Sequence, residues 1–189
     1  MSDLTIKHAG VEVSSNSAGS SISTGKRKSI IITPTITTAT LDGGDVLINS
    51  VEIPNAVKED GGCSILHSIT LVDYDDAEID LDMVITQNSF TLGAVNAAPS
   101  ATAAEIAAAK VLGVIQVDRS DPDSMDLGGA KVQHWTRQSI DVDTSSHKNR
   151  PFPIYLQAAS GSTSVYFSLV TAANTWGAND LEFHFNIEY

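Results

Sequence analysis

Short runs in which apolar and polar residues alternate recur along most of the chain. In residues 78–86, Glu78, Asp80 and Asp82 alternate with apolar side chains at every second position: Ile79, Leu81, Met83 and Ile85. Residues 181–189 repeat the pattern with larger side chains: Leu181, Phe183, Phe185, Ile187 and Tyr189. Successive side chains of a β-strand point to opposite faces of its sheet. Both segments are therefore predicted to be strands with one buried and one solvated face.

Seven further segments rich in β-branched and aromatic residues are predicted to be strands: 30–36, 46–53, 65–72, 112–117, 132–140, 153–158 and 165–171. Clusters of aspartate and glycine, such as residues 42–45 and 60–62, stand between them and favour turns. About nine short strands separated by turns are typical of a sandwich or barrel. The predicted fold class is an all-β, antiparallel, jelly-roll-like β-sandwich.

One segment, residues 101–111, is predicted to be a short helix inserted between strands. It is rich in alanine, and Thr102 and Glu105 have the spacing of a capping box, in which each residue satisfies a backbone N–H group of the other. A single helix excludes a Rossmann-like parallel sheet, because that fold alternates helices with strands throughout.

The first 28 residues differ in composition from the rest. Residues 14–25 are almost all small or polar and cannot bury enough apolar surface to fold alone. Residues 1–28 carry four basic and two acidic side chains, a net charge of +2, which leaves −14 on the remainder of a chain with net charge −12. We therefore expect a flexible basic N-terminal arm over residues 1–28 and a single jelly-roll-like β domain over residues 29–189.

Composition excludes several functional classes. A net charge of −12 disfavours free nucleic acid as a partner, because binding phosphates requires clustered lysine and arginine. No stretch approaches the roughly 20 apolar residues that cross a bilayer, and the N-terminus lacks the pattern of a secretory signal. The single cysteine, Cys63, excludes an internal disulfide and is expected to be a buried or half-buried residue of a protein made in a reducing cytoplasm.

No motif predicts a catalytic, cofactor or metal site. Residues 19–27 partly match a phosphate-binding loop, but the glycines are one residue too far apart and Arg27 stands where a magnesium-binding hydroxyl is needed. Neither His-x-His nor His-Glu-x-x-His spacing occurs among the histidines, which are His8, His67, His134, His147 and His184. No Gly-x-Ser-x-Gly motif occurs, and Cys63 has no base nearby in the sequence. We predict a protein without enzymatic activity.

Two acidic tracts and two tryptophans each have two interpretations. Residues 73–82 and the aspartates of residues 118–126 can supply oxygen ligands to calcium, but solvated turns are the simpler explanation. Trp135 and Trp176 have rings suited to stacking on sugars, but such rings are more often buried in a core or at a subunit contact.

An ordered series of motifs runs from residue 61 towards the C-terminus. Gly61 and Gly62 lead into an apolar strand, an acidic turn at Asp75-Asp76 and a second strand at residues 81–85. An Asn-x-x-x-Leu-Gly segment at residues 88–93 and the alanine-rich helix follow. The series continues at residues 112–115, 153–159 and 179–183. In this order the motifs resemble a group of tailed-bacteriophage structural proteins, over roughly residues 45–189.

The resemblance implies a capsid cement or decoration protein, which is a jelly-roll-like virion protein that binds the outer surface of the icosahedral head and stabilises it. It implies the major capsid protein as partner, a homotrimer as the favoured oligomer, the capsid surface as location, and no cofactor. Residues 1–44 lie outside the resemblance. The basic arm suits docking onto an acidic shell, with Lys26, Arg27 and Lys28 as candidate capsid contacts.

Two other functions stay open at the level of sequence. A carbohydrate-binding jelly-roll module of a phage fibre or spike would present Trp135 or Trp176 on an exposed face. A β-sandwich hydrolase or cupin enzyme would bring histidine and aspartate residues together from distant segments. Burial of both tryptophan rings would exclude the first, and stoichiometric bound transition metal would support the second.

Overall fold

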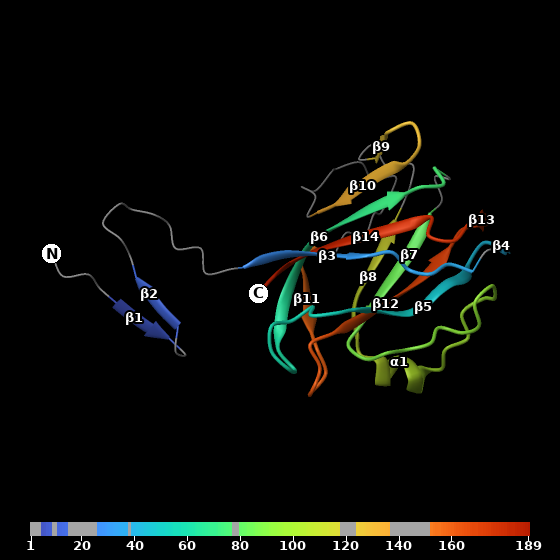
Figure 1. Cartoon of the computed structure of the whole chain (residues 1–189). Helices are drawn as coiled ribbons and strands as arrows, with labels where there is room; N and C mark the ends of the chain where they lie inside the picture. Colours follow the sequence, from blue (N-terminus) through green and yellow to red (C-terminus); the bar gives the residue numbers. More distant parts are fainter. Residues whose placement is uncertain are drawn as a thin grey trace, which may run out of the picture.

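The structure, a computed structural model, describes residues 5–8, 11–14, 26–37, 39–76, 80–117, 124–136 and 152–189. Its regular elements are strands apart from one short helix, which confirms the predicted all-β class. The strands pair antiparallel, and the two largest sheets pack together as a β-sandwich (Figure 1).

The described residues form strands and one helix with the following bounds. The first strands are β1 (Thr5–His8), β2 (Val11–Ser14), β3 (Arg27–Ile32), β4 (Ala39–Leu41), β5 (Asp45–Ile53), β6 (Cys63–Asp73) and β7 (Leu81–Thr86). The helix α1 (Ala103–Ala109) follows. The remaining strands are β8 (Val111–Val117), β9 (Ser124–Asp126), β10 (Lys131–Trp135), β11 (Ile154–Gln157), β12 (Val165–Thr171), β13 (Asn174–Trp176) and β14 (Leu181–Glu188).

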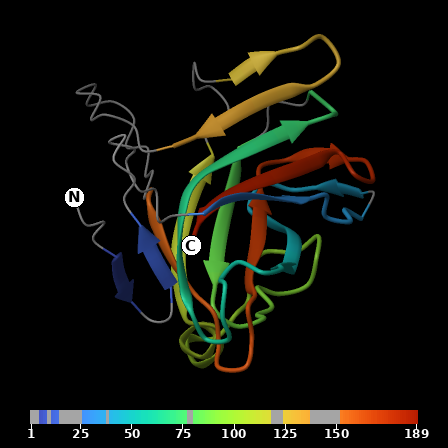
Figure 2. The same cartoon turned by 60° about the vertical axis from the view of Figure 1, so that its left-hand side comes forward.

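Two sheets make up the sandwich. The six-stranded sheet has the order β3-β14-β6-β10-β9, and β11 joins it by pairing with the first part of β6 while β10 pairs with the last part. The four-stranded sheet has the order β5-β12-β7-β8. Figure 2 shows β10 and β9 continuing the first sheet beyond β6. Two small sheets, β1-β2 and β4-β13, complete the described strands.

The pairing of the sandwich strands follows one rule when eight of them are taken in chain order: β3, β5, β6, β7, β8, β10, β12 and β14. The first pairs with the last, the second with the seventh, the third with the sixth and the fourth with the fifth. Two further pairings, β14 with β6 and β12 with β7, complete the two sheets. These strands are therefore paired as one long antiparallel hairpin whose arms are divided between the sheets.

The core lies between the two sheets and follows from the alternation along their strands. β14 buries Leu181, Phe183, Phe185 and Ile187 and leaves the residues between them partly exposed. Phe167 of β12, in the opposite sheet, packs against Phe183 and Phe185 with ring centroids 5.4 and 5.2 Å away. Burying each such side chain contributes roughly 1.5–3 kcal/mol, so this aromatic contact is a main link between the sheets.

Helix α1 begins at the predicted capping box and is two residues shorter at each end than the predicted span 101–111. The Thr102 N–H donates to Oε2 of Glu105 (2.7 Å), and the Glu105 N–H donates to Oγ1 of Thr102 (3.3 Å). The bonds from Thr102 lower the pKa of the Glu105 carboxyl. Lys110 ends the helix in the left-handed conformation, with φ of 54°. No helix within the described ranges has the length and apolar character needed to cross a membrane.

Strand β11 lies close to β8, and Gly113 of β8 makes this approach possible. A Cβ atom at Gly113 would lie 3.0 Å from Cδ1 and 3.2 Å from Cγ2 of Ile154. These distances are shorter than ordinary van der Waals contacts. The missing side chain at Gly113 therefore lets the buried Ile154 pack directly against the backbone of β8.

Each of the nine predicted strands overlaps an observed one, although several differ at their ends. Residues 137–140 of the predicted strand 132–140 and residues 78–79 of the predicted strand 78–86 lie outside the described residues. The sequence did not predict β4, β9 or β13, which have three residues each, nor the hairpin β1-β2. Three residues are too few to display a period of two.

The first two residues of strand β3 are also the last two of the predicted basic arm. Arg27 and Lys28 belong to the sheet, where their partners on β14 are Glu188 and Ile187. The Tyr189 N–H also donates to the backbone carbonyl of Lys26 (3.1 Å). Basic residues mark edge strands as well as linkers, so their charge did not distinguish the two. Residues 1–4, 9–10 and 15–25 lie outside the described residues.

Cys63 is exposed, which corrects the expectation of a buried or half-buried side chain. It is the first residue of β6, and the next inward position of that strand is Ser64, which is buried. The alternation along β6 therefore places Cys63 on the solvent side.

Candidate functional site

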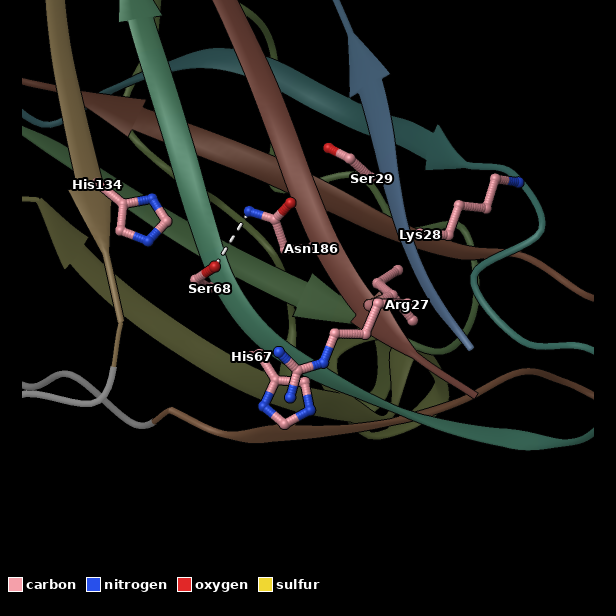
Figure 3. A pocket seen from close by; sticks show the side chains of 8 residues that line it. Arg27, Lys28, Ser29, His67, Ser68, His134 and Asn186 are labelled. Atoms are coloured by element: carbon pink, nitrogen blue, oxygen red, sulfur yellow. Dashed lines mark hydrogen bonds between the residues drawn. The ribbon is translucent and has the colours of Figure 1, made fainter. Parts of the chain in front are cut away.

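Polar side chains gather on the outer face of the six-stranded sheet. The inward positions of β3, β14 and β6 contribute to the core. The polar residues that alternate with them therefore lie on the outer face. A hollow of about 360 Å³ lies over this face (Figure 3). The residues that line it are Arg27, Lys28, Ser29, His67, Ser68, His134, Asn186 and Ile187.

A β-bulge in β6 shapes this hollow. Asn186 pairs with Ser68, but the next residue of β14, Ile187, pairs with Leu66, so His67 is an extra residue in the ladder. In a β-bulge, two residues of one strand lie opposite a single residue of the partner strand, and their side chains are redirected. His67 and Ser68 therefore both line the hollow, although consecutive residues of a regular strand face opposite sides.

Glu188, at the end of β14, contacts a basic side chain on each neighbouring strand. Its Oε2 accepts a hydrogen bond from Nε of Arg27 at 3.2 Å. The same oxygen lies 2.8 Å from Nε2 of His67, a short contact without the angle of a hydrogen bond. The Arg27 side chain is 79% exposed, and exposed ion pairs contribute only about 0–1 kcal/mol. The main effect of Glu188 is to position the two basic groups.

Two further hydrogen bonds join side chains of neighbouring strands across this face. Nδ2 of Asn186 donates to Oγ of Ser68 (3.0 Å), which links β14 to β6. Oγ1 of Thr70 and Nδ1 of His134 are hydrogen-bonded at 2.7 Å, which links β6 to β10. Each such cross-strand pair contributes roughly 0.2–1 kcal/mol, and together they fix the side chains that surround the hollow.

The hollow presents hydrogen-bond donors and a local excess of positive charge. Arg27 and Lys28 carry two positive charges against the one negative charge of Glu188, in a chain whose net charge is −12. In Figure 3 the Lys28 side chain extends away from His134, so its charge acts at longer range than that of Arg27. The arrangement is suited to binding an acidic group.

The structure brings two of the three predicted capsid contacts to this hollow. Arg27 and Lys28 line it, whereas Lys26 precedes β3 and does not. All three side chains are exposed, as a contact with another protein requires.

The sequence did not predict His67, His134 or Asn186 as part of a site. Each lies on a strand that the alternation did predict. The alternation does not say which strands pair, so it could not bring these three residues together. A third histidine, His184, follows on β14 with Nε2 2.7 Å from Oε1 of Glu182. The side chains of the other two histidines, His8 and His147, lie outside the described residues.

The two tryptophans bear on the carbohydrate alternative. Trp176 is fully buried, with 0% of its surface exposed, and its Nε1 donates to Oγ1 of Thr171 (3.3 Å). A buried ring is not available to stack on a sugar. The side chain of Trp135 lies outside the described residues. The carbohydrate-binding alternative therefore depends on the Trp135 ring alone.

The first acidic tract forms a cluster of carboxylates at one end of the six-stranded sheet. Partial desolvation raises the pKa of the Asp75 carboxyl although the residue is exposed, and the neighbouring charges of Asp180 and Asp73 raise it further. Within the described residues, no group of three histidine, cysteine, aspartate or glutamate side chains is arranged to hold a metal ion. Residues 77–79 and 118–123 lie outside them, so the choice between a solvated turn and a calcium site stays untested for both tracts.

Comparison with known proteins identifies no family for this chain. No protein-family model matches it, and no curated protein matches it. Its function is therefore inferred from its own residues and their geometry.

Proposed function

We propose that this chain is a non-enzymatic structural protein of a tailed-phage virion, a cement or decoration protein that binds the outer surface of the icosahedral head and stabilises it. The observation that carries the proposal is the strand pairing, first with last through fourth with fifth, across two sheets. A hairpin of eight strands rolled in this way is the arrangement of a jelly roll, a fold that recurs in viral capsid and lectin domains. The sequence resemblance over roughly residues 45–189 supports the phage context.

A fold alone does not choose between a capsid protein and a lectin. The burial of Trp176 removes one of the two rings that a carbohydrate-binding module would use. The exposed Lys26, Arg27 and Lys28 lie instead at the start of an edge strand, where a large partner can reach them. These observations favour a protein partner over a sugar.

The proposed contact residues are held by the end of the chain. Glu188 holds Arg27, and Tyr189 is hydrogen-bonded to the carbonyl of Lys26. Contacts that are already ordered bind with a smaller loss of conformational entropy than a free arm does. Basic groups on an otherwise acidic body steer it toward an acidic patch of the major capsid protein, in a salt-dependent way.

Co-sedimentation with heads of the phage that encodes the chain tests this proposal. The purified full chain is mixed with expanded heads, pelleted and quantified at low and high salt. The test variant is K26Q/K28Q, which removes two charges and keeps the Arg27–Glu188 pair. The matched control is K58Q/K110Q, which removes two charges from exposed positions away from the hollow at the start of β3.

We expect the natural chain and K58Q/K110Q to pellet with heads, and K26Q/K28Q to bind several-fold more weakly at low salt. Absence of the natural chain from the pellet would refute decoration. Equal binding by the two double variants would show that Lys26 and Lys28 do not contribute to the contact with heads. Sedimentation equilibrium of the free protein is expected to give a trimer, three times the chain mass of 19.9 kDa.

A further inference from the structure

We infer that the hollow at the start of β3 binds an oxyanion, a carboxylate or a phosphate, between Arg27, Asn186 and His134. This site goes beyond attachment to a head, because it assigns a ligand to the isolated protein. The shared chemistry is a negatively charged group with several acceptor oxygens. A free phosphate and the carboxylate of a small molecule or side chain both have it.

The donors around the hollow retain hydrogen-bonding capacity. Among the described residues, Arg27 contacts an acceptor through Nε alone, which leaves its terminal nitrogens for a ligand. His134 uses Nδ1 for Thr70 and keeps Nε2, which is a donor when the Thr70 hydroxyl donates to Nδ1. Asn186 gives one amide hydrogen to Ser68 and keeps the other. Figure 3 shows Asn186 and Ser68 between His134 and the pair of Arg27 and His67, so donors stand on both sides of the hollow.

The chemistry of these groups favours an anion over a cation or a neutral ligand. Glu188 is the one carboxylate that contacts the lining residues in the described structure, and Arg27 and His67 already occupy its Oε2. The hydrogen-bonding groups that remain available around the hollow are therefore mainly donors. The planar fork of an arginine matches the oxygens of carboxylate and phosphate, and such charge-assisted bonds are about twice as strong as neutral ones.

The size of the hollow limits the ligand. Its volume is about 360 Å³. A phosphate, or an aspartate or glutamate side chain, fits with some of its hydration water. A folded protein segment does not fit, so a macromolecule would reach the site only with a projecting acidic side chain.

The test is a titration of isotope-labelled full chain followed by NMR, at fixed pH and ionic strength. One arm uses inorganic phosphate and the other uses acetate, and the readout is the imidazole signals of His67 and His134. Saturable shifts with phosphate alone would assign a phosphate site. Saturable shifts with both would assign a general oxyanion site that accepts carboxylates.

Two variants and one control localise the binding. R27Q is expected to weaken it about tenfold, because a charged hydrogen bond is lost. S29E, which adds a carboxylate to the lining, is expected to abolish it, and K58Q is expected to leave it unchanged. Absence of saturable shifts with either anion, or equal binding by K58Q, R27Q and S29E, would overturn the inference. The titration contains no heads, so its failure leaves decoration untouched, and failure of co-sedimentation leaves this site untouched.

Discussion

Replacement of Phe167 by alanine tests whether the two sheets are joined as described. The Phe167 ring is fully buried and lies 5.4 Å from the ring of Phe183 and 5.2 Å from that of Phe185, both on the opposite sheet. Phe→Ala substitutions in a core cost about 3–5 kcal/mol, because burial is lost and a cavity remains. Each lost aromatic pair accounts for about 0.5–1.5 kcal/mol of this. Such a loss is a large share of a domain stability of about 5–15 kcal/mol.

The assay is equilibrium unfolding in urea, read by tryptophan fluorescence, with the midpoint and slope compared between variants. The matched control is Y166A, because Tyr166 neighbours Phe167 on β12 but is only partly buried. We expect Y166A to cost about 1 kcal/mol, well below F167A. A loss below about 1 kcal/mol for F167A, or equal losses for the two variants, would refute the packing of Phe167 between the sheets.

Three other predictions follow from the same structure. In a W135F background, Trp176 is expected to resist quenching by iodide, because it is buried; efficient quenching would place it at the surface. D75N is expected to raise the melting temperature at pH 7, because a raised pKa means that ionising Asp75 destabilises the fold. That gain is expected to vanish near pH 3, where the carboxyl is protonated in both states, and a constant gain would contradict it. G113V is expected to cost about 1–3 kcal/mol in thermal unfolding through its clash with Ile154, and an unchanged stability would show that β11 lies elsewhere.

The sequence predicted the fold wherever a period of two was long enough to see. Residues 181–189 alternate over nearly their whole length, and the observed β14 buries every second residue as expected. The capping box at Thr102 likewise fixed the start of α1, because its hydrogen bonds are local. The three-residue strands β4 and β13 have no such signal, since they form by pairing with each other across the chain.

The candidate site was less predictable, because register between distant strands creates it. Arg27 meets Glu188 across 161 positions of the sequence, and Asn186 meets Ser68 across 118. The bulge that brings His67 to the surface is a property of how β6 pairs with β14, and neither strand shows it alone. The charge of residues 26–28 predicts a contact there, but it does not reveal that two of these residues belong to a strand.

The most direct test of the proposed attachment is a cryo-electron microscopy map of the parent heads carrying this protein. We expect density for a β-sandwich on the outer surface of the shell, with the start of β3 and its residues Lys26 and Lys28 against the major capsid protein. A shell without this density, or density in which that end of β3 faces the solvent, would contradict the proposal.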